Sequence, residues 1–121
     1  MDTSPEYVKQ CEKAEEIQKG HELEEPDYFS TDGVKVESFC YEYQPDAGIW
    51  LPRQDQLQDM IRLFPDVKFM PVHLVEKIHK FMFTDYAEYT CLFGSMEQLW
   101  LAFYMKEQYE KSWTGTEWVK G

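Results

Sequence analysis

Residues 95–111 read SMEQLWLAFYMKEQYEK, and this stretch decides the fold that the sequence predicts. Ser95 followed by Gln98 matches a capping box, in which two side chains satisfy free backbone N–H groups at a helix start. Apolar side chains then occupy a helical stripe and both of its flanks: Met96, Leu99, Trp100, Leu101, Ala102, Phe103 and Met105. A helix that is apolar on nearly every side is typically buried, so we expect its first half to form the core and its charged second half to reach solvent.

Three further helices are predicted in the part of the sequence that precedes this helix. Apolar residues recur at helical spacing in residues 5–19, 53–64 and 71–83, and each of these segments begins at or just after a proline. Residues 84–93 fit either an extended connection or a strand. The sequence therefore predicts about four helices, with the connection before residue 95 left open.

The segment between residues 28 and 51 changes character and predicts strands. It is rich in β-branched and aromatic residues, and the pair Asp32-Gly33 is typical of a hairpin turn. Ile49 to Leu51 is a candidate third strand. Near the end of the chain, Trp113 to Trp118 predicts a tight turn that returns both indoles to the core.

These elements predict an α+β fold, mainly helical, with a small antiparallel β-sheet in the N-terminal half. With 43% hydrophobic and 17% aromatic residues, the 121-residue chain has ample material for one core, and we expect a single domain over residues 1–121. The expected core residues are Ile49, Trp50, Leu57, Ile61, Phe64, Leu74, Ile78, Phe81, Leu99, Trp100 and Phe103.

Composition also bears on where the protein acts. No run of about 18 apolar residues is present, and the beginning of the chain is too acidic and polar for a secretory signal, so we expect no membrane segment. The three cysteines, Cys11, Cys40 and Cys91, are odd in number and form no CxxC pair. This usage favours reduced, packed thiols in a cytoplasmic protein and argues against structural zinc.

The formal net charge of −11 is concentrated near the N-terminus. Residues 1–46 hold 13 of the 23 acidic residues and 4 of the 12 basic residues, which gives this part a net charge of −9. Because affinity for nucleic acids comes largely from Lys and Arg on phosphates, we expect no direct nucleic-acid binding. A basic protein is the partner class that this charge favours.

Three motifs resemble a group of small proteins encoded by phages and prophages of Gram-positive, Firmicutes-type bacteria. They are YVKQCEKAEEIQKG (7–20), IWLPRQDQLQDMI (49–61) and SMEQLWLAFYMKEQYEKSWTGTEW (95–118). The resemblance is loosest over residues 21–47 and 65–94. It implies a phage accessory protein that acts in the cytoplasm of the bacterial host, and it carries no active site with it.

The sequence offers little for catalysis or cofactor binding. Nothing places the three histidines beside a cysteine or an acid, as nucleophilic catalysis requires. On a helix, His73 and His79 would diverge by about 240 degrees, which disfavours a metal site with Glu76 between them. No glycine-rich phosphate loop is present. We therefore predict no catalytic residues, no metal and no cofactor, and a small enzyme ranks third among the functions considered.

Two candidate partner-binding sites remain, each with an ordinary structural interpretation beside it. The acidic residues of the first are Glu22, Glu24, Glu25, Asp27 and Asp32. They form either a solvated surface that promotes solubility or a surface that occupies a basic groove on a partner. The second site is Trp50 with Arg53. Either Trp50 fills the core while Arg53 is solvated, or the two residues together anchor a partner as a hot spot.

We expect a non-enzymatic interaction protein. The first hypothesis is an acidic protein that binds and inhibits a host defence or nucleic-acid-processing protein. The alternative is an adaptor or self-associating structural protein of phage development, which would use a neutral, aromatic contact around Trp50 or Trp118. The sequence does not predict an oligomeric state.

Overall fold

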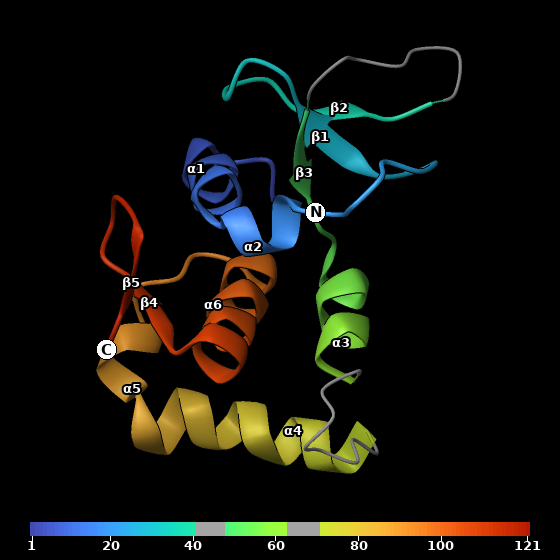
Figure 1. Cartoon of the computed structure of the whole chain (residues 1–121). Helices are drawn as coiled ribbons and strands as arrows, with labels where there is room; N and C mark the ends of the chain where they lie inside the picture. The colour runs from blue at the N-terminus through green and yellow to red at the C-terminus, as the bar shows by residue number, and fades with distance from the viewer. Residues whose placement is uncertain (41–47, 63–70) are drawn as a thin grey trace.

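The computed structural model describes residues 1–40, 48–62 and 71–121, and its central element is α6 (Met96–Tyr109). Figure 1 shows the three-stranded sheet at the top, α4 (Pro71–Lys80) across the bottom and α6 between them. Helix α6 contacts α1 (Pro5–Lys13), α3 (Gln54–Arg62) and β4 (Lys111–Trp113). Every residue from Gln98 to Met105 is buried, so the prediction that the first half of this helix forms the core is confirmed.

The start of α6 has half of the predicted capping box. Ser95 accepts a hydrogen bond from the backbone N–H of Gln98 at 3.1 Å, as expected. The second bond of the capping box, from the backbone N–H of Ser95 to the Gln98 side chain, is not formed. The Gln98 side-chain oxygen accepts from the N–H of Gly94 at 3.3 Å, and its nitrogen donates to the Asp2 carboxylate at 2.8 Å. The Gln98 amide therefore ties α6 to the N-terminal segment, while Ser95 caps the helix.

The predicted helix over residues 5–19 is two helices, α1 and α2 (Glu15–Gln18), separated by Ala14. The break has a physical reason in the side chain of Gln18. Its amide donates to the carbonyl of Cys11 at 3.0 Å, and it also bonds both the N–H and the C=O of Trp50, at 2.8 and 2.9 Å. Gln18 thus satisfies backbone groups of α1 and of a strand at once, which a continuous helix would not allow.

The predicted antiparallel sheet is present but shorter than expected. Its order is β2-β1-β3, with β1 (Tyr28–Ser30) paired to both β2 (Glu37–Ser38) and β3 (Ile49–Leu51). Asp32-Gly33 lies in the turn between β1 and β2, and Gly33 has the positive φ of +79° that such a turn requires. Residues 34–36, which belong to the segment predicted to form strands, are not in a strand, because β2 begins only at Glu37; Val34 is 70% exposed. Tyr41 and Tyr43 lie outside the described residues.

The segment before α6 is helical and not a strand. Helix α4 continues into a π-helical turn, η1 (Phe81–Asp85), and α5 (Ala87–Thr90) follows. The hydroxyl of Thr90 donates to the carbonyls of Met82 and Ala87, at 3.0 and 3.2 Å. These bonds stabilise the widened turn, because they satisfy backbone oxygens that regular helical bonding leaves free.

The chain ends in a hairpin of β4 and β5 (Trp118–Lys120), where a tight turn was predicted. Trp113 and Trp118 are directly paired, their ring centroids lie 5.2 Å apart, and both side chains are buried. The return of both indoles to the core is therefore confirmed.

Most predicted core residues are buried in the described structure. Ile49 is only half-buried, and Phe64 lies outside the described residues. The list of expected core residues left out the apolar face of the first predicted helix, whose residues are buried: Tyr7, Val8, Cys11, Ala14 and Ile17. None of the described helices is both long enough and apolar enough to cross a bilayer.

Candidate functional site

The loop over residues 21–27 connects α2 to β1 and ends in a buried carboxylate, Asp27. Only 3% of Asp27 is exposed. One carboxylate oxygen lies 2.9 Å from His21 Nε2 and accepts from the backbone N–H of Glu24 at 3.0 Å, and the other accepts from Gln56 Nε2 at 2.7 Å. Asp27 therefore closes the loop on itself and joins it to α3.

These hydrogen bonds set the ionisation of the buried acid. Burial alone would raise the pKa of Asp27, but the bonds from the Glu24 backbone, His21 and Gln56 outweigh it and hold the pKa below its ordinary value. Asp27 is consequently ionised at neutral pH, and its charge is used inside the protein. It is not available to a partner.

The side chain of Gln56 belongs to the start of α3 and explains how that helix is fixed to the loop. Its oxygen accepts from the N–H of Arg53 at 2.9 Å, which satisfies a free donor at the helix start, while its nitrogen binds Asp27. The prediction that nothing places a histidine beside an acid is wrong for His21, and the sequence did not single out Gln56. The signal for Gln56 was available, since glutamine three residues after a helix cap is the second half of a capping box.

Trp50 lies beneath this network and is 5% exposed. The His21 ring stacks on its indole, with centroids 3.5 Å apart and planes 12° from parallel. The Trp50 Nε1–H is buried and has no hydrogen-bond partner among the described residues. The ordinary interpretation, in which Trp50 fills the core, fits this position, and a hot-spot role would require an exposed indole.

Arg53 is partly exposed and already engaged. Its guanidinium donates to Asp55 at 3.1 Å and to the carbonyl of Pro26 at 3.4 Å, and it lies 3.8 Å from Asp27. The arginine therefore fastens α3 to the 21–27 loop. Two candidates that looked separate in sequence, the acidic segment and the Trp50 to Arg53 corner, lie in one place.

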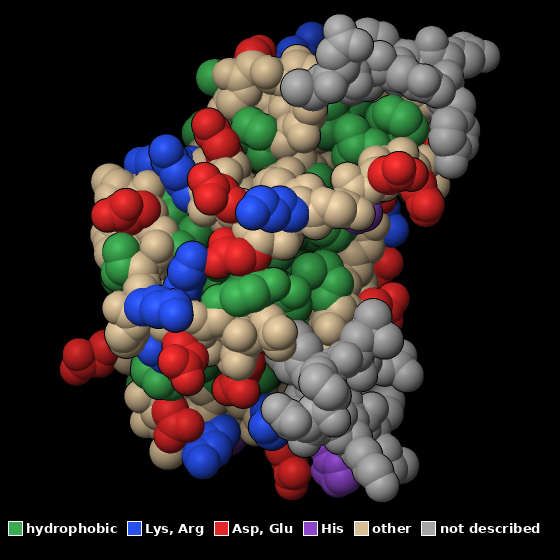
Figure 2. Space-filling view, in the orientation of Figure 1, with side chains coloured by type: hydrophobic (Ala, Val, Ile, Leu, Met, Phe, Trp, Pro, Cys, Tyr) green, Lys and Arg blue, Asp and Glu red, His purple; other side chains and the backbone are tan. Residues whose placement is uncertain are grey.

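The five acidic residues predicted as one partner-binding site do not form a single surface. Glu22, Glu24 and Glu25 are exposed on the 21–27 loop, which we call the acidic loop, and Figure 2 shows acidic side chains over it at the right edge of the visible face. Asp32 lies beyond the other end of β1, in the β1–β2 turn. In that turn the carboxylate of Glu12, from α1, lies beside Gly33.

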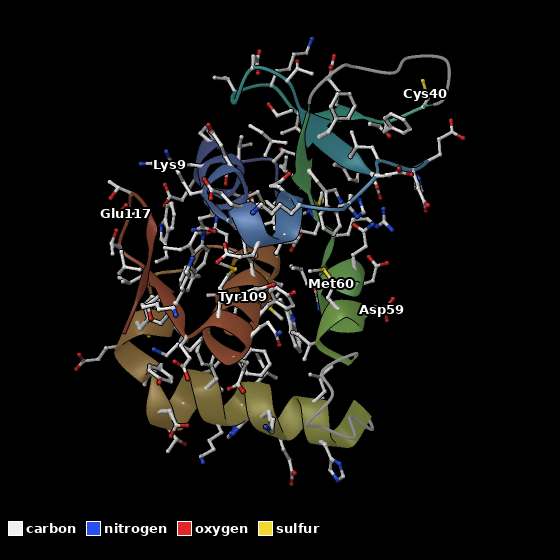
Figure 3. All side chains as sticks on the ribbon, in the orientation of Figure 1. Lys9, Cys40, Asp59, Met60, Tyr109 and Glu117 are labelled. Carbon is white, nitrogen blue, oxygen red and sulfur yellow. The ribbon has the colours of Figure 1, made fainter. Side chains whose placement is uncertain are left out.

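The His21 and Asp27 pair lacks the third member of a nucleophilic site. The described groups that contact the pair are amides, an arginine, the Glu24 backbone and the Trp50 ring, with no thiol or hydroxyl among them. Of the three cysteines, Cys11 is buried, Cys40 is half-buried at the sheet edge (Figure 3), and Cys91 is exposed, which contradicts the expectation that all three are packed. Burial raises the pKa of the Cys11 thiol far above its ordinary value, so it is not a nucleophile.

No metal-binding cluster is found in the described ranges either. Within residues 1–40, 48–62 and 71–121, no three His, Cys, Asp or Glu side chains are placed to hold an ion. Comparisons with known proteins add no family: no family model, no curated protein and no solved structure matches this chain.

Proposed function

We propose that this protein is a phage accessory protein without enzymatic activity, which uses its acidic loop to bind a basic protein of the bacterial host. The partner class that fits is a host defence or nucleic-acid-processing protein, whose phosphate-binding groove would receive carboxylates in place of phosphates. Binding in that groove would inhibit the partner. The protein would act in the cytoplasm, where such partners are found.

The observation that carries this proposal is the fixed presentation of three exposed carboxylates. Glu22, Glu24 and Glu25 belong to a loop whose end is held by Asp27 and whose Pro26 carbonyl is held by Arg53. A loop that is already ordered loses less conformational entropy on binding than a flexible acidic tail would. The carboxylates can therefore act as a preformed surface for positive charge.

The overall charge supports the same class of partner. With a net charge of −11, this protein would be steered toward a basic surface and repelled by nucleic acid. Such complexes form quickly and weaken as salt screens the charges. Salt sensitivity is thus the property that distinguishes this function from an adaptor with an apolar contact.

The test is affinity capture of bacterial host proteins by the tagged protein at about 0.1 M and about 1 M salt, where the Debye length is about 10 Å and about 3 Å. We expect basic proteins to be captured at low salt only. The triple variant Glu22→Lys, Glu24→Lys, Glu25→Lys should lose them. The matched control Glu88→Lys, Glu107→Lys, Glu117→Lys changes the net charge equally at exposed positions outside the loop and should retain them.

Asp27 is left out of these substitutions because its loss would disturb the fold rather than the surface. Capture of the same proteins by the loop variant and the wild type would contradict the proposal. So would equal loss in the control variant, since that result would assign binding to total charge and not to the acidic loop.

One observation favours the alternative of an adaptor or self-associating protein. Three large apolar side chains in the stretch of chain from η1 to the first residue of α6 are exposed, Phe83 (66%), Leu92 (78%) and Met96 (48%), and we call them together the apolar patch. Trp50 and Trp118, where a neutral contact was expected, are buried. A neutral contact would therefore use the apolar patch, and capture that persists at high salt would support it.

A further inference from the structure

A small hollow lies between α1, α5 and the β4–β5 hairpin, on the left of the molecule in Figure 1 and away from the acidic loop. Its volume is about 150 Å³. Three aromatic residues line it, Tyr89, Phe93 and Trp113. Leu92, Thr114 and Gly115 complete the sides, while Glu6 and Gln10 contribute from α1.

The aromatic walls are fixed by bonds to one another and to α1. The Tyr89 hydroxyl accepts from the backbone N–H of Trp113 at 2.7 Å, and the Phe93 ring stands at 86° to the Tyr89 ring with centroids 5.0 Å apart. The indole N–H of Trp113 donates to Glu6 at 3.0 Å. The hollow is thus preformed, and a ligand would not have to order its walls.

Glu6 supplies negative charge at the rim of the hollow. The only bond of its carboxylate among the described groups is the one from the neutral Trp113 indole, so the carboxylate makes no ion pair within the described part of the chain. Lys9 is the nearest base on the same helix. Its ammonium extends over the hairpin turn to the Gly115 carbonyl at 3.0 Å, and Figure 3 shows it on the same side of the molecule as Glu117. It makes no ion pair with Glu6.

The deepest lining residue, Gln10, has a hydrogen-bond acceptor without a donor. Only 1% of Gln10 is exposed. Its orientation follows from the neighbouring amide: Gln98 Oε1 accepts from Gly94, so the atom that Gln10 presents to it, at 3.4 Å, is the donor Nε2. Gln10 Oε1 is left buried with no partner among the described residues. A ligand N–H that reached this buried oxygen would relieve its unsatisfied state.

We infer that this hollow is a binding site for a guanidinium group. A guanidinium is planar and weakly hydrated, stacks on aromatic faces, forms paired bonds with a carboxylate and has several N–H donors. These properties match the three rings and Glu6, and an N–H that reached Gln10 Oε1 would also satisfy that buried acceptor. A quaternary ammonium ion would match the rings and the charge but has no N–H for Gln10. A primary ammonium ion would have to leave a stronger hydration shell to enter an aromatic site.

The size of the hollow sets the extent of the ligand. An apolar cavity of about 150 Å³ holds one benzene molecule. The hollow therefore has room for a guanidinium and the adjoining methylene groups, and the rest of a larger molecule would stay outside it. The guanidinium can come from a small free compound or from an arginine side chain on a partner protein, and the chemistry is the same for both.

This inference does not depend on the acidic loop, because no residue of that loop lines the hollow. The test titrates the full chain with methylguanidinium at constant ionic strength and follows the NMR signals of the Trp113 indole N–H and the Gln10 side-chain amide. Tetramethylammonium and tert-butanol serve as a cationic probe without N–H donors and as a neutral probe of similar size. We expect saturable shifts of both signals with methylguanidinium and at least fivefold weaker binding of the other two.

Two variants locate the binding. Glu6→Gln keeps an acceptor for the Trp113 indole but removes the charge, so we expect about tenfold weaker binding with an unchanged fold. Phe93→Leu removes one ring face and should weaken binding as well. The control Glu117→Gln removes a charge from the same hairpin outside the hollow and should bind as the wild type does.

Several results would overturn the inference. They are the absence of a saturable shift with methylguanidinium, equal or tighter binding of tetramethylammonium or tert-butanol, and wild-type affinity in Glu6→Gln. Short peptides then distinguish a free guanidinium compound from an arginine side chain of a partner protein as the natural ligand. A peptide with one arginine that binds much more tightly than methylguanidinium, while its citrulline counterpart does not bind, assigns the site to a protein-borne arginine. Equal affinity of the arginine peptide and methylguanidinium assigns it to free guanidinium compounds.

Discussion

At the scale of single residues, Asp27 has the largest structural role in the candidate site. A carboxylate with this many donors is stabilised in its ionised form, and its low pKa links its charge to the stability of the fold. Because the folded pKa lies below the unfolded value, the stabilisation is present above the unfolded pKa. It is lost as the pH falls through the folded pKa.

Substitution of Asp27 by Asn tests this role. The new amide N–H₂ would face donors from the Glu24 backbone, His21 or Gln56, so we expect a loss of about 2 kcal/mol in the free energy of unfolding at pH 7. Urea unfolding measures the difference from the wild type. The difference should shrink between about pH 4 and about pH 2, as the wild-type carboxyl becomes protonated.

Glu25→Gln is the control for Asp27→Asn, because Glu25 is an exposed acid on the same loop. It should change the free energy of unfolding by less than about 0.5 kcal/mol, both at pH 7 and at about pH 2. A difference between Asp27→Asn and the wild type that stays constant down to about pH 2 would show that the charge of Asp27 does not stabilise the fold.

At the scale of elements, the starts of α1 and α6 are held together by one residue, Asp2. Its carboxylate accepts from the Ser4 backbone N–H at 2.8 Å, from the Ser95 hydroxyl and from Gln98 Nε2 at 2.8 Å. Ser4 and Ser95 are the N-caps of α1 and α6. Burial raises the pKa of Asp2, but these bonds outweigh it and the net shift is downward, so the bridge is ionised at neutral pH.

Because one carboxylate contacts both caps, substitutions at the two ends of the bridge should not be additive. We expect Asp2→Ala and Ser95→Ala each to lower the free energy of unfolding by about 1–2 kcal/mol. The double variant should lose about 0.5–1 kcal/mol less than the sum of the two. Urea unfolding of all four proteins measures this coupling, and Thr3→Ala, at an exposed neighbour, should have little effect. Full additivity would show that Asp2 and Ser95 stabilise the fold independently.

The sequence predicts elements well where the cause is local and fails where it is distant. Periodicity and capping residues locate α3, α4 and α6 to within a few residues. The break at Ala14 is different, since it depends on bonds from Gln18 to a strand 32 residues away. The site shows the same limit. Exposed Glu22 and buried Asp27 are both acids in one segment, and only the positions of His21 and Gln56 in space distinguish them.

At the scale of the whole molecule, two surface properties predict opposite responses to salt. Binding of a basic partner through the acidic loop should weaken as salt screens the charges. Contacts between copies of this protein should strengthen, because screening reduces the mutual repulsion of molecules with a net charge of −11. The apolar patch is the surface on which such contacts would form.

The apolar patch is small, and its size decides how strong self-association can be. A few exposed side chains bury far less than the roughly 1,200 Å² of a stable interface, so we expect weak association that appears only at high salt. Sedimentation of the wild type should show a mean mass that rises from about 0.1 M to about 1 M salt. Phe83→Ser with Leu92→Ser should abolish the rise and leave stability within about 0.5 kcal/mol, since both side chains are exposed. An equal rise in this variant would place the contact elsewhere, whereas a stable wild-type dimer at low salt would favour the adaptor function over the acidic inhibitor.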